Sequence, residues 1–304
     1  MTGGTTRGRA AGGTARPRPV RGAGARTPRT ASRGVELELC AQNGLVAGMC
    51  EVGRGALAGP VAVGVAVVDA SCGEPPEGLT DSKCLTPRRR EALCGPVEEW
   101  VLASAVGWAG ADEVDRFGII VALRLAGLRA LEEVRSAAVE PGIVLLDGSH
   151  DWLTPPEDTL FPAEGAWDAD ADADADGDAD GYEGAAGAPA AGLPAGLSVG
   201  AMGPGVPVVT RVRADLECAV VSAASVLAKV RRDARMCALP DPGYDWVHNK
   251  GYASPSHVEA LGRLGPCELH RRSWHLPGVV PAGAVRPSTS PMRPAAGGEG
   301  MMGL

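Results

Sequence analysis

The chain has 304 residues, 45% of them hydrophobic, and a formal net charge of −8 at pH 7. That apolar fraction is enough for a buried core, yet no apolar run approaches the roughly 20 residues that a membrane-spanning helix needs. The eight cysteines are scattered without a C-x-x-C pair, a pattern that disfavours a zinc site or a disulfide framework and favours free thiols in a reducing cytosol.

Charge and composition divide the chain into segments. Residues 1–34 contain eight arginines and no acid, whereas residues 151–204 contain twelve acids and no lysine or arginine. We therefore expect a disordered basic tail over 1–43, an acidic low-complexity insertion over 151–204 and a second tail over 283–304. One domain over 44–282 would contain the rest. The insertion largely sets the acidic pI, so that pI does not argue against a nucleic-acid partner.

Apolar periodicity predicts an α/β layer fold between the tails. Valine-rich or apolar runs predict buried strands, in chain order, at 45–50, 61–68, 101–106, 143–146 and 206–212. Helices are expected from Thr86, over 114–130, over 217–236 and from about Ser254. Thr86 and Ser254 are each followed by proline, the arrangement of a capping hydroxyl and a first-turn proline. Small residues along 222–228 predict that their helix lies tightly against the sheet.

Three carboxylates fall at or just after the ends of predicted strands: Glu51, Asp147 and Asp215. Strand ends are where α/β folds assemble their sites. Carboxylates that converge repel one another unless a cation lies between them, so a hard divalent ion is indicated. Two such ions would activate a water and stabilise the leaving oxygen of a phosphodiester. The alternative for each acid taken alone is a solvated strand end or a helix cap.

Several short motifs share one order with a known family. They are Cys50-Glu51 leading into Gly53-Arg54-Gly55, then Asp81-Ser82-Lys83, Asp147-Gly148, Arg213-Ala214-Asp215, the run from Ser222 to Asp233, Asn249-Lys250-Gly251-Tyr252 and His270-Arg271-Arg272-Ser273. Their order and spacing resemble bacterial ribonuclease HII across nearly the whole structured portion. The resemblance implies a ribonuclease H-like fold, a mixed five-stranded sheet flanked by helices, with a helical C-terminal extension.

The resemblance also implies an activity and a set of site residues. It implies endonucleolytic cleavage of RNA in RNA–DNA hybrids, and 5′ to a ribonucleotide embedded in duplex DNA, with two Mg²⁺ or Mn²⁺ ions. The family's four metal-site acids fall on Cys50, Glu51, Asp147 and Asp215. Its Gly-Arg-Gly turn falls on Gly53, Arg54 and Gly55.

The chemistry of individual residues predicts further substrate contacts. Glycines allow close approach of the backbone to nucleic acid, and Arg54 can hold a phosphate. The ring of Tyr252 can stack on a sugar or base. Lys83, Lys229 and Arg232 are candidate phosphate contacts, although each has the alternative of a solvated basic side chain.

Cys50 stands where the family has an aspartate that is expected to contact both metal ions. A thiol offers one soft atom in place of two hard oxygens and is mostly protonated near neutrality, whereas Mg²⁺ prefers oxygen. We therefore expect severely reduced activity in Mg²⁺ and partial rescue by Mn²⁺. A catalytically silent hybrid-binding protein is the alternative function. A cytoplasmic monomer is the default expectation for either.

Overall fold

The computed structural model describes Met1 and residues 30–156 and 203–279. Most of the expected basic tail, acidic insertion and C-terminal tail lies outside the described residues, so those expectations remain predictions. Within the described ranges, no helix combines the length and apolar character required to cross a membrane.

The five strands of the described residues form one mixed sheet in the order β3-β2-β1-β4-β5. They are β1 (Val46–Val52), β2 (Val61–Val68), β3 (Ala103–Ala109), β4 (Ile143–Asp147) and β5 (Val208–Arg211). The pairs β1–β2 and β2–β3 are antiparallel, whereas β1–β4 and β4–β5 are parallel. The predicted mixed five-stranded sheet is confirmed, although β3 begins and ends later than the sequence pattern indicated.

Helices flank the sheet and extend beyond its end. They are α1 (Gly34–Asn43), η1 (Ser82–Cys84), α2 (Pro87–Trp100), α3 (Ala111–Phe117), α4 (Ile119–Ser136), α5 (Ala214–Glu217), α6 (Ala219–Ala238), α7 (Trp246–Asn249) and α8 (Pro255–Leu264). The predicted caps are confirmed, because the hydroxyls of Thr86 and Ser254 accept backbone N–H groups of α2 and α8. Each of the two long helices predicted from periodicity is broken once, at Gly118 with φ of 78° and at the extended residue Cys218.

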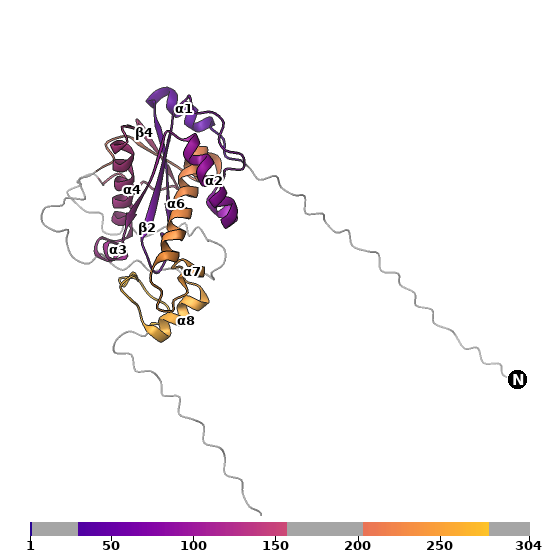
Figure 1. Ribbon diagram of the computed structural model, residues 1–304, viewed down its shortest axis with the longest axis vertical. Coiled ribbons are helices and arrows are strands. Elements are labelled where there is room, and N and C mark those ends of the chain that lie inside the picture. Colours follow the sequence, from indigo (N-terminus) through magenta and orange to yellow (C-terminus); the bar gives the residue numbers. More distant parts are fainter. Residues whose placement is uncertain (2–29, 157–202, 280–304) are drawn as a thin grey trace, which may run out of the picture.

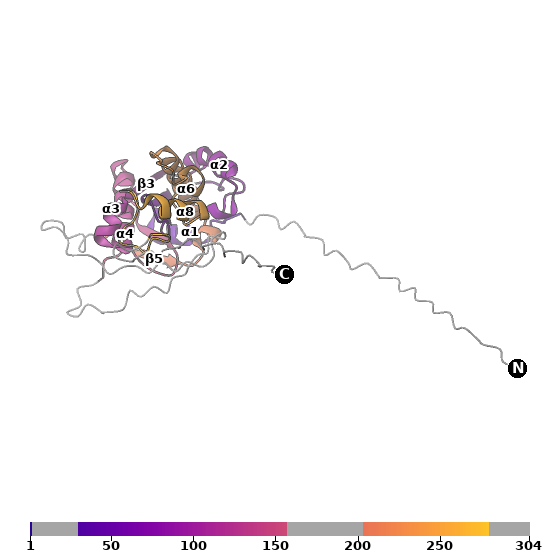
Figure 2. The ribbon, with the colours of Figure 1, turned by 90° about the horizontal axis from the view of Figure 1, so that it is seen from below.

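The two faces of the sheet carry different helices, as Figure 1 shows with α4 on one side and α6 and α2 on the other. Side chains alternate along each strand, so successive residues enter opposite layers. On β1, Val46 and Cys50 pack into the layer under α6, whereas Ala47 and Met49 pack into the layer under α4. Viewed from below in Figure 2, α4 and α2 again lie on opposite sides of the molecule.

Helix α6 lies against β1 and β2 at glycine contacts. A Cβ at Gly48 would stand 2.6 Å from the Val220 carbonyl carbon, and one at Gly64 would stand 2.2 Å from the Ala224 carbonyl oxygen. Any side chain at either position would push the helix off the sheet. The prediction of tight packing by the small residues of this helix is confirmed. Tight packing also holds the start of α6 close to Cys50.

The ordered fold begins earlier than the expected tail boundary at residue 43, because α1 covers Gly34–Asn43. Glu36 is fully buried, and its carboxylate accepts the Val220 N–H at 2.7 Å. Cys218, the residue before α6, offers no side-chain cap. Glu36 therefore satisfies a first-turn amide of α6 from a distant part of the chain. That contact explains why a segment with little helical signal is held against the domain.

Residues 239–279, the C-terminal layer, form a separate small layer below the sheet, with α7 and α8 (Figure 1). Its core contains Tyr244, Trp246 and Leu261, packed against Met236 of α6 and against Leu57 in the turn after β1. The predicted helical C-terminal extension is thus present. It contacts the glycine-flanked turn that follows the strand bearing Cys50 and Glu51.

Candidate metal centre

Cys50, Asp147 and Asp215 converge at one edge of the sheet. Each offers a ligand atom, and these three atoms all lie within 4.8 Å of one another. Asp147 ends β4, the parallel neighbour of β1, and the carboxyl ends of parallel strands meet at the same edge. Asp215 lies in α5, just after β5, and its N–H donates to Asp147 Oδ1 at 3.3 Å. Three of the four predicted site residues therefore form a compact group.

Glu51 borders this group without being one of the three. It follows Cys50 on β1, so the two side chains point to opposite faces of the strand. Its Oε1 lies 3.7 Å from Arg54 Nη1. Its Oε2 is buried without a hydrogen-bond partner among the described residues. A buried carboxylate oxygen without a donor is costly, and a cation beside it would remove that cost.

Asp81 adds a carboxylate that the sequence analysis did not assign to the site. It is buried at the start of η1, where one of its oxygens accepts the Lys83 N–H at 2.9 Å. It contacts Asp215 closely enough to shift the ionisation of that residue through charge and hydrogen bonding. The available sequence signal was its place in the Asp81-Ser82-Lys83 motif. No predicted strand end pointed to it.

The cluster resists full ionisation in the absence of a cation. Burial raises the pKa of Asp215 to about 8, with further increases from Asp147 and Asp81 and an opposing effect of Lys83. Burial, opposed chiefly by Arg54, raises the pKa of Glu51. Like charges in a poorly solvated site cannot all ionise at neutral pH. A divalent ion would stabilise the ionised forms, so this set of oxygens suits one.

The thiol of Cys50 does not suit a hard ion. Burial raises its pKa well above the usual cysteine range, and Asp147, Glu51 and Asp215 raise it further. The sulfur makes a long 3.7 Å contact to the Glu51 carbonyl, and the Ser225 hydroxyl of α6 also reaches it. The metal-free protein therefore keeps a neutral, protonated thiol here. Of the donors, the oxygens fit Mg²⁺ and the sulfur does not.

The glycine-flanked turn after β1 is held rigidly from behind. Gly53 is buried with φ of 82°, and a Cβ there would stand 2.0 Å from Arg232 Nε. Gly55 is exposed, and the space around it is open. The buried guanidinium of Arg271 donates to the carbonyls of Gly53 at 2.7 Å and Arg54 at 2.5 Å. The exposed side of the turn, with Gly55 and the half-exposed Arg54, remains accessible beside Glu51.

Lys83 and Lys229 are two of the predicted basic contacts. Lys83 lies near the carboxylates of the metal centre, and Lys229 lies near Tyr252. Lys83 is exposed after Asp81, and its charge lowers the pKa values of both Glu51 and Asp215. Lys229 lies 5.4 Å from the centre of the half-buried Tyr252 ring and pairs with Asp233 at 3.2 Å. Lys229 and Tyr252 line a cleft of about 440 Å³ between α2, α6 and α7.

Arg232 is not a phosphate contact, contrary to the sequence-based expectation. Its side chain is completely buried. The guanidinium donates to the Pro60 carbonyl at 2.9 Å and to the Lys250 carbonyl at 3.1 Å, and its Cζ lies 5.3 Å from the centre of the Tyr252 ring. Arginine has a rigid donor fork that can satisfy several carbonyls at once. Arg232 therefore joins the turn after β1 to the Tyr252 segment from inside.

Comparison with known proteins agrees with this arrangement. A sequence profile of ribonuclease HII matches residues 47–173 and 199–276. Ribonuclease HII of Streptomyces avermitilis is 37% identical over 244 residues, and that of Streptomyces griseus is 39% identical over 247 residues. Each match covers 79% of this chain and 82% of the relative.

A solved structure supports the fold independently. The crystal structure of ribonuclease H2 from Pyrococcus horikoshii matches with a TM-score of 0.50 at 22% identity, covering 76% of this chain and 94% of that chain. Likeness at this identity concerns the fold alone. The sequence matches carry the assignment: this chain belongs to the ribonuclease HII family, a family of endonucleases.

Proposed function

We propose that this protein cleaves RNA in RNA–DNA hybrids, and 5′ to a ribonucleotide embedded in duplex DNA, leaving a 5′-phosphate. The observation that carries the proposal is the group of Cys50, Asp147 and Asp215, whose ligand atoms lie within 4.8 Å of one another. An accessible Gly-Arg-Gly turn lies next to it. A single copy of the chain holds all of these residues, so a monomer suffices.

Divalent ions, when bound, would activate a water and stabilise the leaving oxygen. The chain's own part is to gather Asp147, Asp215 and Glu51 as oxygen ligands and to present Arg54 to a phosphate. Gly55 and its neighbours expose backbone where a 2′-hydroxyl can be distinguished from hydrogen. The Tyr252 ring and Lys229 extend the contact surface toward a sugar or base and its phosphate.

The thiol of Cys50 weakens the reaction in Mg²⁺. It takes a position where two hard oxygens would complete the coordination, and its raised pKa keeps it protonated. Mn²⁺ tolerates sulfur better than Mg²⁺ does. We therefore propose that cleavage is slow in Mg²⁺ and faster in Mn²⁺.

The test is cleavage of three duplexes by the full chain: an RNA–DNA hybrid, DNA with one ribonucleotide, and DNA alone. We expect cleavage of the first two in Mn²⁺, with 5′-phosphate ends, and none of the third. Asp147→Asn is the matched control, because it removes one metal ligand with little change in shape and should abolish turnover. Activity that persists in Asp147→Asn would refute the proposed site.

The second candidate is a hybrid-binding protein that does not cut. The neutral buried thiol in the metal centre is the specific observation that favours it. Tight binding of the hybrid with no product in either metal would select this alternative. Absence of both binding and cleavage would contradict both functions.

A further inference from the structure

We propose that His257 and His270 are positioning residues for Tyr252, joined in a one-directional hydrogen-bond relay that sets this ring relative to the Gly53–Gly55 turn. The proposal rests on the proposed function only in taking Tyr252 as a substrate contact. His257 lies in α8, and His270 lies in the loop that follows it. Both side chains are buried, at 0% and 1% exposure.

The relay links four groups by hydrogen bonds of ordinary length. The Cys267 N–H donates to His270 Nδ1 at 3.0 Å. His270 Nε2 lies 3.0 Å from His257 Nε2, and His257 Nδ1 lies 2.8 Å from the Tyr252 carbonyl oxygen. The chain of contacts therefore runs from the loop after α8 to the backbone of Tyr252.

The end groups determine which nitrogen of each ring carries the proton. The Cys267 N–H can only donate, so His270 Nδ1 accepts and the proton of a neutral ring lies on Nε2. The Tyr252 carbonyl can only accept, so His257 carries its proton on Nδ1 and accepts on Nε2. The two assignments are compatible, because His270 Nε2 carries a proton and donates it to the unprotonated His257 Nε2. Burial keeps both rings neutral, lowering the pKa of His257 and bringing that of His270 to about 4.

The relay fixes a segment that is already tied to the turn after β1. The Gly251 carbonyl accepts the N–H groups of Leu57 at 2.8 Å and Ala58 at 3.2 Å. The Tyr252 carbonyl accepts the Ser254 N–H at 2.8 Å in addition to His257. Gly251 is thus bound to the turn and Tyr252 to α8, so the backbone that carries the Tyr252 ring has little freedom.

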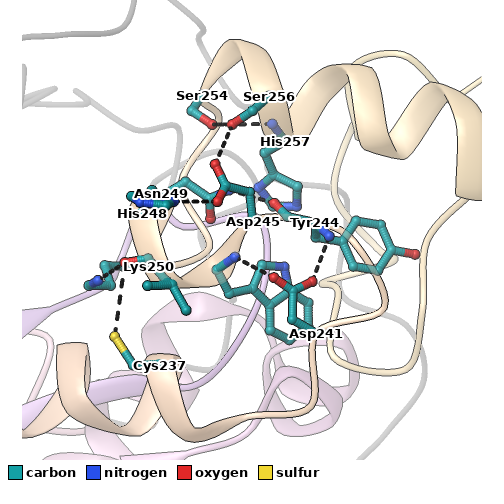
Figure 3. Close-up of polar contacts among 12 residues, drawn as sticks. Cys237, Asp241, Tyr244, Asp245, His248, Asn249, Lys250, Ser254, Ser256 and His257 are labelled. Carbon is teal, nitrogen blue, oxygen red and sulfur yellow. Dashed lines mark hydrogen bonds and ion pairs between the residues drawn. The ribbon is translucent and has the colours of Figure 1, made fainter.

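The preceding loop is ordered by a second set of polar contacts, shown in Figure 3. Asp241 accepts the Tyr244 N–H at 2.6 Å and the Trp246 N–H at 2.8 Å. The Asn249 amide donates to the Tyr244 carbonyl at 2.6 Å and accepts the Gly251 N–H at 2.8 Å. These contacts shape the loop up to Gly251, and His257 is the side chain that continues the support to Tyr252.

Arg271, the next residue after His270, supports the turn after β1. Arg271 holds the Gly53 and Arg54 carbonyls, as described above, while His270 acts through His257 on Tyr252. Adjacent backbone positions therefore support the two surfaces proposed to contact the substrate. The C-terminal layer thus helps to set their separation, together with Arg232 of α6.

A double-mutant cycle on the full chain tests this role, with hybrid affinity measured in EDTA so that no cleavage occurs. We expect His257→Leu and Tyr252→Ala each to weaken binding about tenfold, the scale of one stacking contact. The double variant should bind no more weakly than Tyr252→Ala alone. His257→Asn keeps a donor near the Nδ1 position and should bind within about threefold of the natural chain.

Leu261→Ala is the control for general loss of stability, because Leu261 is buried in the same layer and takes no part in the relay. Amide hydrogen exchange over residues 250–254 supplies a readout that does not need substrate. Exchange should accelerate more in His257→Leu and in a second variant, His270→Leu, than in His257→Asn or Leu261→Ala.

Additive losses in the cycle, or equal acceleration in Leu261→Ala, would overturn the positioning role. A natural chain that binds no hybrid would instead refute the proposed function, while the exchange comparison would still decide whether the relay holds Tyr252. The two failures are therefore distinguishable.

Discussion

Replacing Cys50 by aspartate should increase Mg²⁺-dependent cleavage and lower the stability of the metal-free protein. Cys50 is 5% exposed, and its Sγ lies within 4.8 Å of oxygens of both Asp147 and Asp215. A carboxylate there would add a negative charge to a group in which Asp215 already has a pKa of about 8. The same substitution would replace one soft donor with two hard ones.

The distances give the size of both effects. At 4.8 Å and an effective dielectric constant of about 20, each ionised neighbour repels the new carboxylate by about 3.5 kcal/mol. A divalent ion about 4 Å away attracts it by about 8 kcal/mol on the same scale, so bound ions reverse the sign. Even about 3 kcal/mol of this attraction, if expressed in the transition state, corresponds to roughly a hundredfold in rate.

The assay is single-turnover cleavage of a duplex with one embedded ribonucleotide, comparing Cys50→Asp with the natural chain in Mg²⁺ and in Mn²⁺. We expect a gain of about a hundredfold or more in Mg²⁺ and a smaller gain in Mn²⁺. Cys50→Ser, which restores neither charge nor a second oxygen, is the matched control. Equal Mg²⁺ rates for the natural chain and Cys50→Asp would refute the reasoning.

Cd²⁺ should bind through Cys50, giving a sulfur-to-cadmium charge-transfer absorbance that Cys50→Ser lacks; equal spectra would contradict thiol ligation. Arg232→Ala strips donors from buried carbonyls and should cost roughly 3 kcal/mol, or about 10 °C in Tm by calorimetry. The folded protein raises the pKa of Asp215 to about 8. The contribution of protonated Asp215 to the free energy of unfolding is therefore fully present at acid pH, below the pKa of the unfolded chain, and is lost as pH rises toward 8. In EDTA, Asp215→Asn should therefore exceed the natural chain in urea stability by a few kcal/mol at pH 9 and lose that advantage near pH 4.

Local sequence chemistry predicted most of the secondary structure. Valine-rich runs gave strands within a few residues of those observed, because buried strands need continuous apolar side chains. Thr86 and Ser254 marked helix starts that the structure confirms, since capping depends on residues three positions apart. Periodicity missed the breaks at Gly118 and Cys218, because apolar spacing continues across both.

The candidate site was predictable in part. Asp147 and Asp215 end or follow strands, so their convergence with Cys50 follows from parallel pairing at one sheet edge. Asp81 was missed as a site member because it lies in a loop whose position depends on packing under α6. Arg232 was wrongly expected to face phosphate, since nothing local distinguishes a buried arginine from a solvated one.

The sequence by itself determined the fold class, the family and the unusual donor at position 50, because these depend on residue identity and order along the chain. Tertiary structure alone decided which charges are buried, how Glu36 caps α6 across 184 positions, and how His257 and His270 reach Tyr252. Such contacts join residues whose separation along the chain carries no periodic signal. They form only after hydrophobic packing has placed the helices, and burial then sets the ionisation and the hydrogen-bond direction of each group.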